Sequence, residues 1–284
     1  MHNISYIYMV VVYIYTDFSN MNRLEVLSAR LGACGYEVKH VNNISNLDIT
    51  NNIIISTNEE NQYPIFKNFV KSNIYFMLND KIQFYNYIKQ NYDLLSDGIQ
   101  FIPTYDHTYK GPNIYKEFLF KDKNGYSAAF NNKIKGNVYD LIKTYASKYQ
   151  IQDIMNVKHI LGVSLSCMFG KILGVYSYKT NEAITNKTLV NGFDAVRCNF
   201  VEDAVVRKFI KRFVERINYF GIIELEFLID QNNTIYVMEC NPRISGSLNI
   251  VRYFDWVIIP YIKALQNRSL NEYDIDNKSL WTHV

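Results

Sequence analysis

Acidic residues interrupt apolar, β-rich sequence in residues 220–251, and this stretch constrains the fold more than any other part of the chain. Two apolar runs there flank the polar turn Asp230-Gln231-Asn232-Asn233, a pattern that predicts a β-hairpin. Glu224 and Glu226 lie inside the first run and, being two residues apart, are expected on the same face of a strand. Burying a carboxylate without a partner is costly, so these acids indicate a site rather than a plain core strand.

Further oxygen ligands follow in the second run. Glu239 ends this run, and Asn241 and Arg243 follow it at intervals of two residues. Carboxylate and amide oxygens that face each other across a hairpin suit Mg²⁺, and a guanidinium beside them suits a polyphosphate. The alternative is an ordinary edge hairpin with solvated carboxylates, but it leaves the acids inside the apolar runs unexplained.

The residues after the second run carry a family resemblance. Residues 239–247 read Glu-Cys-Asn-Pro-Arg-Ile-Ser-Gly-Ser and resemble the E-x-N-P-R-x-S-G/R-S signature of ATP-grasp enzymes, notably carbamoyl phosphate synthetase-like ones. The upstream residues that resemble the G-x-x-x-x-[EQ]-F…D segment of the same family are Gly221, Glu226, Phe227 and Asp230. The resemblance implies that Glu226, Glu239 and Asn241 hold Mg²⁺, with Mn²⁺ as an alternative.

Strands and helices alternate in the first part of the chain. Strands are expected at 4–15, 36–41, 53–56 and 74–78, with helices between them, which predicts a small parallel α/β unit. The fold class implied by the resemblance is α/β, with a Rossmann-like pre-ATP-grasp domain at 1–78. A two-subdomain (α+β) ATP-grasp domain would follow at 79–284, with its nucleotide lid subdomain at about 110–155.

Two lysines are candidates for binding the phosphates of ATP. Lys81 follows Asn79-Asp80 at the start of an expected helix and resembles the basic residue of the family's [ND]-[KR]-x-x-F helix. Lys116 resembles the lysine of the family's P-x-ϕ-x-K-P strand, although Glu117 stands in place of the final proline. The lid loop is expected at 121–130, where Gly125 is the one glycine, and a single glycine makes a weak phosphate nest.

The segment Ile151-Gln152-Asp153-Ile154-Met155 resembles the ϕ-Q-E-ϕ-ϕ hinge strand of the family. The resemblance implies that Gln152, Asp153 and Ile154 contact the nucleotide, mainly through the backbone. It also implies that His159 contacts the ribose or a phosphate, as in relatives such as biotin carboxylase. The alternative for His159 is a structural role in a strand.

The resemblance implies an ATP-dependent carboxylate–amine ligase that acts through an acyl-phosphate. Arg243 and Lys116 would be the catalytic cations, which stabilise the transferred phosphoryl group. Two alternatives stay open. One is a catalytically degraded ATP-binding regulatory or structural module, which the single-glycine loop and Asp153 favour. The other is a bicarbonate-activating, carbamoyl-phosphate-like enzyme, for which 284 residues leave no room for a second ATP-grasp half.

Composition and charge limit the classes of binding partner expected for this chain. A net charge of +3 is too small to indicate nucleic acid binding. The apolar run at 4–15 is too short to span a bilayer as a helix, and the four cysteines show neither zinc-ligand nor disulfide spacing. We therefore expect a cytoplasmic protein that acts on a small-molecule carboxylate and amine, without membrane or nucleic acid partners. The family resemblance adds a homodimer as the expected assembly.

Overall fold

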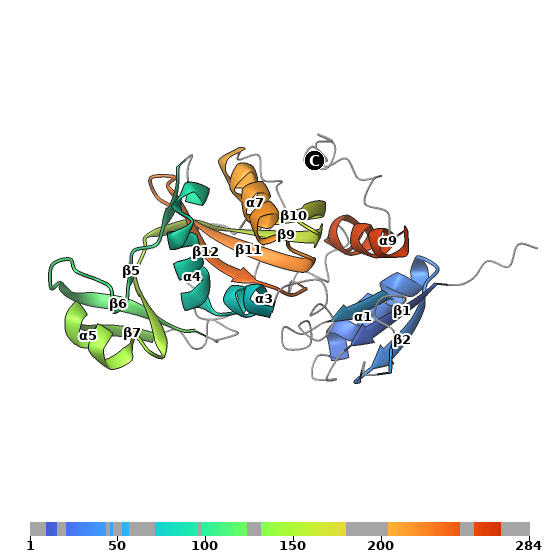
Figure 1. Cartoon of the computed structure of the whole chain (residues 1–284), viewed down its shortest axis with the longest axis horizontal. Helices are drawn as coiled ribbons and strands as arrows, with labels where there is room; N and C mark the ends of the chain where they lie inside the picture. The colour runs from blue at the N-terminus through green and yellow to red at the C-terminus, as the bar shows by residue number, and fades with distance from the viewer. Residues whose placement is uncertain are drawn as a thin grey trace, which may run out of the picture.

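The computed structural model describes residues 10–15, 21–43, 46–47, 53–56, 72–95, 98–123, 132–179, 204–244 and 253–267. Three sheets follow one another along the long axis of the molecule (Figure 1). A three-stranded sheet lies at one end, a five-stranded central sheet lies in the middle, and a four-stranded sheet lies at the other end. The class is mixed α/β, as expected. Among the described helices, none is both long and apolar enough to cross a membrane.

The three-stranded sheet is parallel, in the strand order β2-β1-β3. Its strands and its helix are β1 (Val11–Tyr15), β2 (Glu37–Val41), β3 (Ile53–Ser56) and α1 (Met21–Ala33). Leu24, Leu27 and Leu31 recur at helical spacing and are fully buried, together with Val12 and Ile14 of β1. This confirms the small parallel α/β unit that the alternation of strands and helices predicts.

The strand expected at 74–78 is wrong, because these residues belong to helix α3 (Ser72–Asn79). Met77 and Leu78 are buried in the core of the central sheet, beside Phe84. A short apolar run can be a buried strand or a buried turn of helix, and periodicity alone does not separate the two. The helix expected at 66–70 lies outside the described residues.

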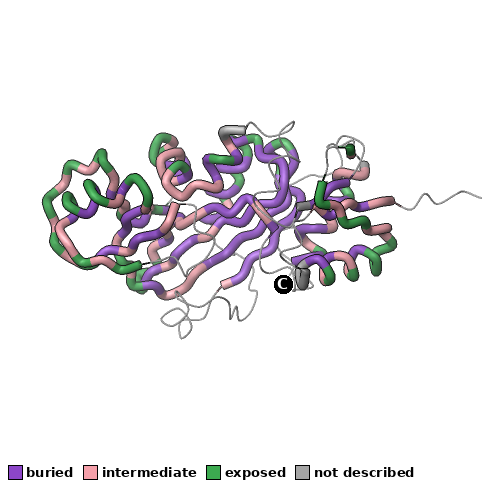
Figure 2. Tube along the Cα trace, turned by 90° about the horizontal axis from the view of Figure 1, so that it is seen from below, coloured by how far each residue is buried: buried purple, intermediate pink, exposed green. Residues whose placement is uncertain are grey.

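The central sheet has the order β10-β9-β11-β12-β4. Its strands are β9 (Val157–Met168), β10 (Lys171–Lys179), β11 (Gly221–Asp230), β12 (Ile235–Asn241) and β4 (Ile99–Phe101). Neighbours are antiparallel except for β4, which runs parallel to β12. The β11–β12 hairpin is the one that the acidic stretch predicts, and its strands lie in the most buried part of the chain (Figure 2).

Helices cover one face of the central sheet. They are α3, α4 (Lys81–Gln90), the 3-10 turn η1 (Tyr92–Leu95) and α7 (Ala204–Ile217). Phe84 of α4 and Phe213 of α7 meet edge to face with ring centroids 5.8 Å apart, and Phe209 meets Phe227 of β11 at 5.7 Å. These aromatic contacts fix α4 and α7 against β11. The carboxylates of β11 therefore lie on the opposite face.

Two helical segments, η4 (Phe254–Ile258) and α9 (Ile259–Asn267), pack against β10. The first is a π-helix, in which the Ile259 N–H donates to the Phe254 carbonyl. Pro260 has no N–H, so the carbonyl of Trp256, four residues earlier, has no α-helical donor. That carbonyl lies against the Cα of Gly174, where a Cβ would overlap it. Glycine is therefore required at this contact.

The four-stranded sheet has the order β5-β8-β6-β7. Its elements are β5 (Thr104–Tyr105), β6 (Tyr115–Asp122), β7 (Asn132–Asn137), β8 (Tyr149–Asp153) and helix α5 (Val138–Tyr145). Phe118, Phe120 and Ile151 are fully buried against α5 on one face of this sheet. The lid subdomain expected at about 110–155 falls on this sheet.

Candidate functional site

Two rows of side chains cross the face of the central sheet opposite α4 and α7, because the register aligns residues of four adjacent strands. The first row, from β10 to β12, is Tyr178, Gly162, Glu226 and Glu239. The second row is Tyr176, Ser164, Glu224 and Asn241. Glu224 and Glu226 therefore share one face, as the spacing predicts. The register also sets Glu226 directly opposite Glu239.

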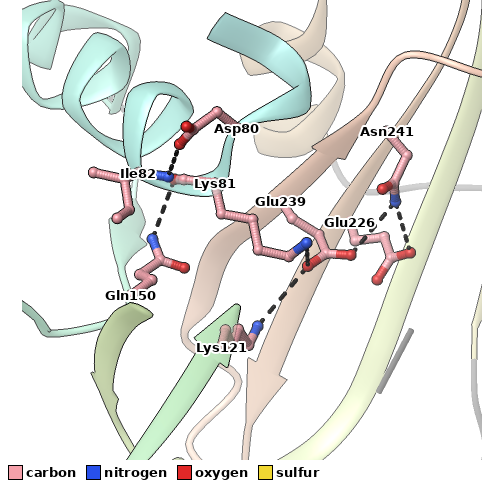
Figure 3. A network of polar contacts seen from close by, with 8 residues as sticks. All are labelled: Asp80, Lys81, Ile82, Lys121, Gln150, Glu226, Glu239 and Asn241. Atoms are coloured by element: carbon pink, nitrogen blue, oxygen red, sulfur yellow. Dashed lines mark hydrogen bonds and ion pairs between the residues drawn. The ribbon is translucent and has the colours of Figure 1, made fainter. Parts of the chain in front are cut away.

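The Asn241 side chain joins the two carboxylates of the first row. Its Nδ2 donates to Glu226 Oε1 at 3.3 Å and to Glu239 Oε1 at 3.5 Å (Figure 3). Two carboxylates with an adjacent amide are a donor set that suits Mg²⁺, since the amide oxygen can be turned toward a cation. No group of three or more His, Cys, Asp or Glu side chains among the described residues could hold a metal by itself. A magnesium ion here would need further oxygens from phosphates.

Two ammonium groups approach the same oxygen of Glu239. Lys81 Nζ lies 3.9 Å from Glu239 Oε2, and Lys121 Nζ lies 4.0 Å from it (Figure 3). The Lys121 side chain is only 7% exposed, so its charge is largely removed from water. Lys81 comes from the first turn of α4 and Lys121 from the end of β6. Two converging lysines beside a carboxylate can bind a polyphosphate.

Burial and neighbouring charges set the pKa values of this cluster. Burial, followed by the charges of Glu239 and Glu224, raises the pKa of Glu226 well above its ordinary value. Burial would also raise the pKa of Glu239, but Lys81 and Lys121 outweigh it and hold the pKa below its ordinary value. Burial lowers the pKa of Lys121 despite the charge of Glu239. A divalent cation would relieve the repulsion between Glu226 and Glu239.

Backbone and side-chain contacts hold the four-stranded sheet against α4 at this point. The Lys81 N–H donates to the Lys123 carbonyl at 3.2 Å, and Gln150 Nε2 donates to the Lys81 carbonyl at 3.2 Å. Asp80 caps α4 through its Oδ1, which accepts from the N–H groups of Ile82 and Gln83. These contacts place Lys121 over β12.

Arg243 lies two residues beyond the end of β12. Its N–H donates to the Asn241 carbonyl at 2.8 Å, which forms a tight turn after the strand. Its charge lowers the pKa of both Glu226 and Glu239, so the guanidinium lies near the carboxylate pair. The remainder of the signature, at 245–247, lies outside the described residues.

Lys116 lies on strand β6, but its side chain is not close to Glu226 and Glu239. Its Nζ pairs with Asp153 Oδ1 at 2.6 Å and lies 5.2 Å from the ring centroid of Phe118. Lys121 is five residues further along β6, about 16 Å away and on the opposite face. Lys121, and not Lys116, is thus the strand lysine that faces Glu239. The sequence contains a signal for this difference. Lys116, Phe118 and Phe120 are spaced two residues apart, so they share one face of β6, and the two phenylalanines on that face are buried in the core.

The hinge residues Gln152, Asp153 and Ile154 lie at the end of β8. Gln152 is paired with both neighbouring strands, opposite Thr104 and Leu119. The Asp153 carboxylate accepts from the Tyr105 hydroxyl at 2.9 Å in addition to its ion pair with Lys116, so both of its contacts are within the four-stranded sheet. Ile154 lies one residue beyond β8 and is 40% exposed.

An apolar cluster lies next to the carboxylates on the same face of the central sheet. Its members are Ile102, Met155, Val157, Ile160, Leu228, Tyr236 and Met238. Leu228 is two residues from Glu226, so the cluster begins about 7 Å along β11 from the carboxylate pair. Within the part of the chain that the structure describes, the buried Oε1 atoms of Gln150 and Gln152 have no hydrogen-bond partner. Apolar surface with unpaired acceptors suits a purine base with an exocyclic amino group.

His159 does not share this face. In the register it lies opposite Ile229 and in phase with Leu161, on the face that α4 and α7 cover. The structure therefore separates His159 from the carboxylate pair. It brings together Lys81, Glu226, Glu239, Asn241 and Arg243.

Comparison with known proteins defines the fold. No protein-family model matches the chain, and no curated protein matches it. D-alanyl-alanine synthetase A from Vibrio cholerae aligns over 91% of this chain and 98% of its own, with a TM-score of 0.59 and 11% identity. L-amino acid ligase from Bacillus licheniformis aligns over 93% of this chain and 74% of its own, with a TM-score of 0.56 and 11% identity. N5-carboxyaminoimidazole ribonucleotide synthetase from Thermotoga maritima aligns over 91% and 76%, with a TM-score of 0.55 and 13% identity.

These similar structures are a ligase and two synthetases, and the chain shares their fold, which agrees with the ATP-grasp fold that the sequence resemblance implies. A carboxyaminoimidazole ribonucleotide synthase from Aspergillus clavatus with the same fold was solved in complex with ATP, at a TM-score of 0.56 and 12% identity.

Proposed function

We propose that this chain is an ATP-dependent carboxylate–amine ligase, with ATP bound between the four-stranded sheet and the central sheet. The observation that carries this proposal is the convergence of Lys81 and Lys121 on Glu239, beside Glu226 and Asn241. The four-stranded sheet would be the nucleotide lid, and the ATP-grasp domain would span 79–284. The Rossmann-like domain would be 1–78, and the cytoplasm and a homodimeric assembly stay our expectations.

The side chains that surround Glu239 each have a place in this reaction. Lys81 and Lys121 would bind the nucleotide phosphates, and the apolar cluster beside Leu228 would hold the base next to Gln152 and Ile154. Glu226, Glu239 and Asn241 would hold Mg²⁺ (or Mn²⁺), which neutralises phosphate charge when bound. Arg243 would stabilise the transferred phosphoryl group.

The reaction would have two steps. A carboxylate oxygen of the first substrate bonds to the γ-phosphorus, the bond from that phosphorus to the β,γ-bridging oxygen breaks, and ADP leaves. An amine nitrogen then bonds to the acyl carbon, and the bond from this carbon to the phosphate oxygen breaks. Inorganic phosphate leaves, and the amine proton passes to solvent. Positioning and charge neutralisation supply most of the rate enhancement in such transfers.

The test is Mg²⁺-dependent ADP release in the presence of pooled carboxylates and amines, in the wild type and in Glu239→Ala. We expect release that requires both pools and falls at least about a hundredfold in the variant, since it removes a partner of both lysines. Nucleotide binding without release under every acceptor mixture would instead support the ATP-binding module. Release supported by bicarbonate without any other carboxylate would support the bicarbonate-activating alternative.

A further inference from the structure

The side chain of Tyr178 crosses the central sheet from β10 and ends beside the carboxylate pair. Its ring lies over Gly162 of β9, where a Cβ would overlap both the ring and the hydroxyl oxygen. The hydroxyl therefore lies where the side chain of residue 162 would begin. Gly162 is directly opposite Glu226 in the register, and the Cβ atoms of opposite residues lie about 4.5–5.5 Å apart. The Tyr178 hydroxyl is thus a neighbour of the Glu226 side chain.

This hydroxyl is a buried donor that still needs an acceptor. Tyr178 is 4% exposed, and within the part of the chain that the structure describes its hydroxyl makes no hydrogen bond. Burial raises the pKa of Tyr178 well above its ordinary value, and the charges of Glu224, Glu226 and Glu239 raise it further. The phenol is therefore neutral and keeps its hydrogen. Buried polar hydrogens are nearly always bonded, so a ligand with an acceptor oxygen suits this position.

The net charge around the hydroxyl does not select a ligand by itself. Glu224 is 2% exposed and already accepts a hydrogen bond from Ser164 Oγ at 3.3 Å. Arg243 supplies a positive charge on the same side, since it lowers the pKa of both Tyr178 and Glu226. The guanidinium and the Glu224 carboxylate oppose each other in their effect on a bound charge. The hydrogen that the phenol can donate is then the feature that distinguishes one ligand from another.

The geometry of phosphoryl transfer indicates which acceptor would lie there. The attacking and leaving oxygens lie roughly in line, on opposite sides of the γ-phosphorus. Lys81 and Lys121 converge on Glu239 of β12 (Figure 3), so the phosphates of ADP would lie on that side of Glu226. The attacking carboxylate would then approach from the other side of Glu226, toward β9 and β10. The Tyr178 hydroxyl lies on this side.

We propose that the Tyr178 hydroxyl donates a hydrogen bond to the carboxylate of the first substrate and holds it in line with the γ-phosphorus. This inference rests on the proposed ligase function and specifies where its first substrate binds. The hydrogen stays on Tyr178, and the bond goes to the carboxylate oxygen that does not attack. A neutral donor bonds a carboxylate less strongly than a cation does, so the attacking oxygen keeps more of its charge.

The test measures hydroxamate formation by the wild type and by Tyr178→Phe, which keeps the ring and removes the hydroxyl. Hydroxylamine traps an acyl-phosphate as a hydroxamate, and the probe is the member of the carboxylate pool that gives the most hydroxamate with the wild type. We expect the KM for this carboxylate to rise about tenfold to a hundredfold, since the lost hydrogen bond is to a charged group. The KM for Mg·ATP should change less than about twofold, because both lysines lie on the other side of Glu226.

Tyr92→Phe is the matched control, because it makes the same change on a tyrosine of η1 that is 72% exposed. It should leave both KM values unchanged. An unchanged KM for the carboxylate in Tyr178→Phe would overturn the proposal. An equal rise in both KM values would also overturn it and would assign the hydroxyl to the nucleotide and its metal.

A second variant decides if Tyr178→Phe does not fold. Gly162→Ala displaces the hydroxyl without removing it, so the KM for the carboxylate should rise there as well. An unchanged value in Gly162→Ala would then overturn the proposal. Failure of the proposed function is distinguishable, because the wild type would in that case form no hydroxamate from any carboxylate.

Discussion

Lys121 at the end of β6 lies with its Nζ 4.0 Å from Oε2 of Glu239 on β12, so a lysine of the four-stranded sheet faces a carboxylate of the central sheet. Lys81 reaches the same oxygen from α4 at 3.9 Å. The site therefore belongs to neither sheet alone. Its geometry depends on how the four-stranded sheet is docked, which the contacts of Lys81 with Lys123 and Gln150 fix.

The two lysines of β6 should differ in their effect on nucleotide binding. We expect Lys121→Met to weaken Mg·ATP binding about tenfold to a hundredfold, since a charge-assisted contact contributes about 1.5–3 kcal/mol. Lys116→Met should change the affinity less than about threefold, because Lys116 pairs with Asp153 on the other face. The shift of the thermal midpoint by Mg·ATP measures both. A larger loss of affinity in Lys116→Met than in Lys121→Met would instead show that Lys116 binds the phosphates.

Glu226 should destabilise the protein in the absence of ligand. Burial and two neighbouring carboxylates raise its pKa, so the fold disfavours its ionised form. We expect Glu226→Gln to raise the free energy of unfolding by about 1 kcal/mol at neutral pH, and to abolish most of the stabilisation by Mg·ATP. Urea unfolding with and without Mg·ATP gives both quantities. A variant that is less stable without ligand would show that Glu226 is a favourable structural charge instead.

Gly162 should be required by the Tyr178 ring. A Cβ at this position would overlap the ring, so we expect Gly162→Ala to cost about 1–3 kcal/mol of stability. In the double variant with Tyr178→Ala the clash is absent, and the two costs should not add. Denaturant unfolding of the four proteins in this cycle checks the prediction. Additive costs would mean that the two residues are not in contact.

Gly174 and Gly32 form a matched pair of glycines. A Cβ at Gly174 would overlap the Trp256 carbonyl of the π-helix, whereas a Cβ at Gly32 of α1 meets nothing within 4 Å. We expect Gly174→Ala to lower the thermal midpoint, at a cost of about 1–3 kcal/mol. Gly32→Ala should raise it, with a gain of about 0.5–1 kcal/mol from helix propensity. Equal effects would contradict the close approach of Trp256 to Gly174.

Local sequence pattern predicted the elements whose spacing is unambiguous. The hairpin around residues 230–233, the Asp80-capped helix and the parallel unit with Leu24, Leu27 and Leu31 are present as expected. The proposed metal ligands Glu226 and Glu239 could be selected from the sequence, because acids inside apolar strands need an explanation. The secondary structure of short apolar runs such as 74–78 could not be predicted, since a buried helix and a buried strand share that pattern.

Contacts between distant segments were harder to predict. Lys121 was missed because the choice of Lys116 followed a motif and did not follow the alternation of Phe118 and Phe120 along β6. The face that His159 occupies depends on the register of β9 with β11, which sequence alone does not give. The rows that join Tyr178 to Glu226 likewise combine four strands from distant parts of the chain.

The most direct test of the central claim is a calorimetric titration of the wild-type protein with ATP, in excess Mg²⁺ and in excess EDTA. The account predicts saturable binding with Mg²⁺, with a Kd below about 1 mM, and a large loss of affinity in EDTA. The absence of any saturable heat at millimolar Mg·ATP would contradict it. So would equal affinity in EDTA, because Glu226, Glu239 and Asn241 would then hold no metal with the nucleotide.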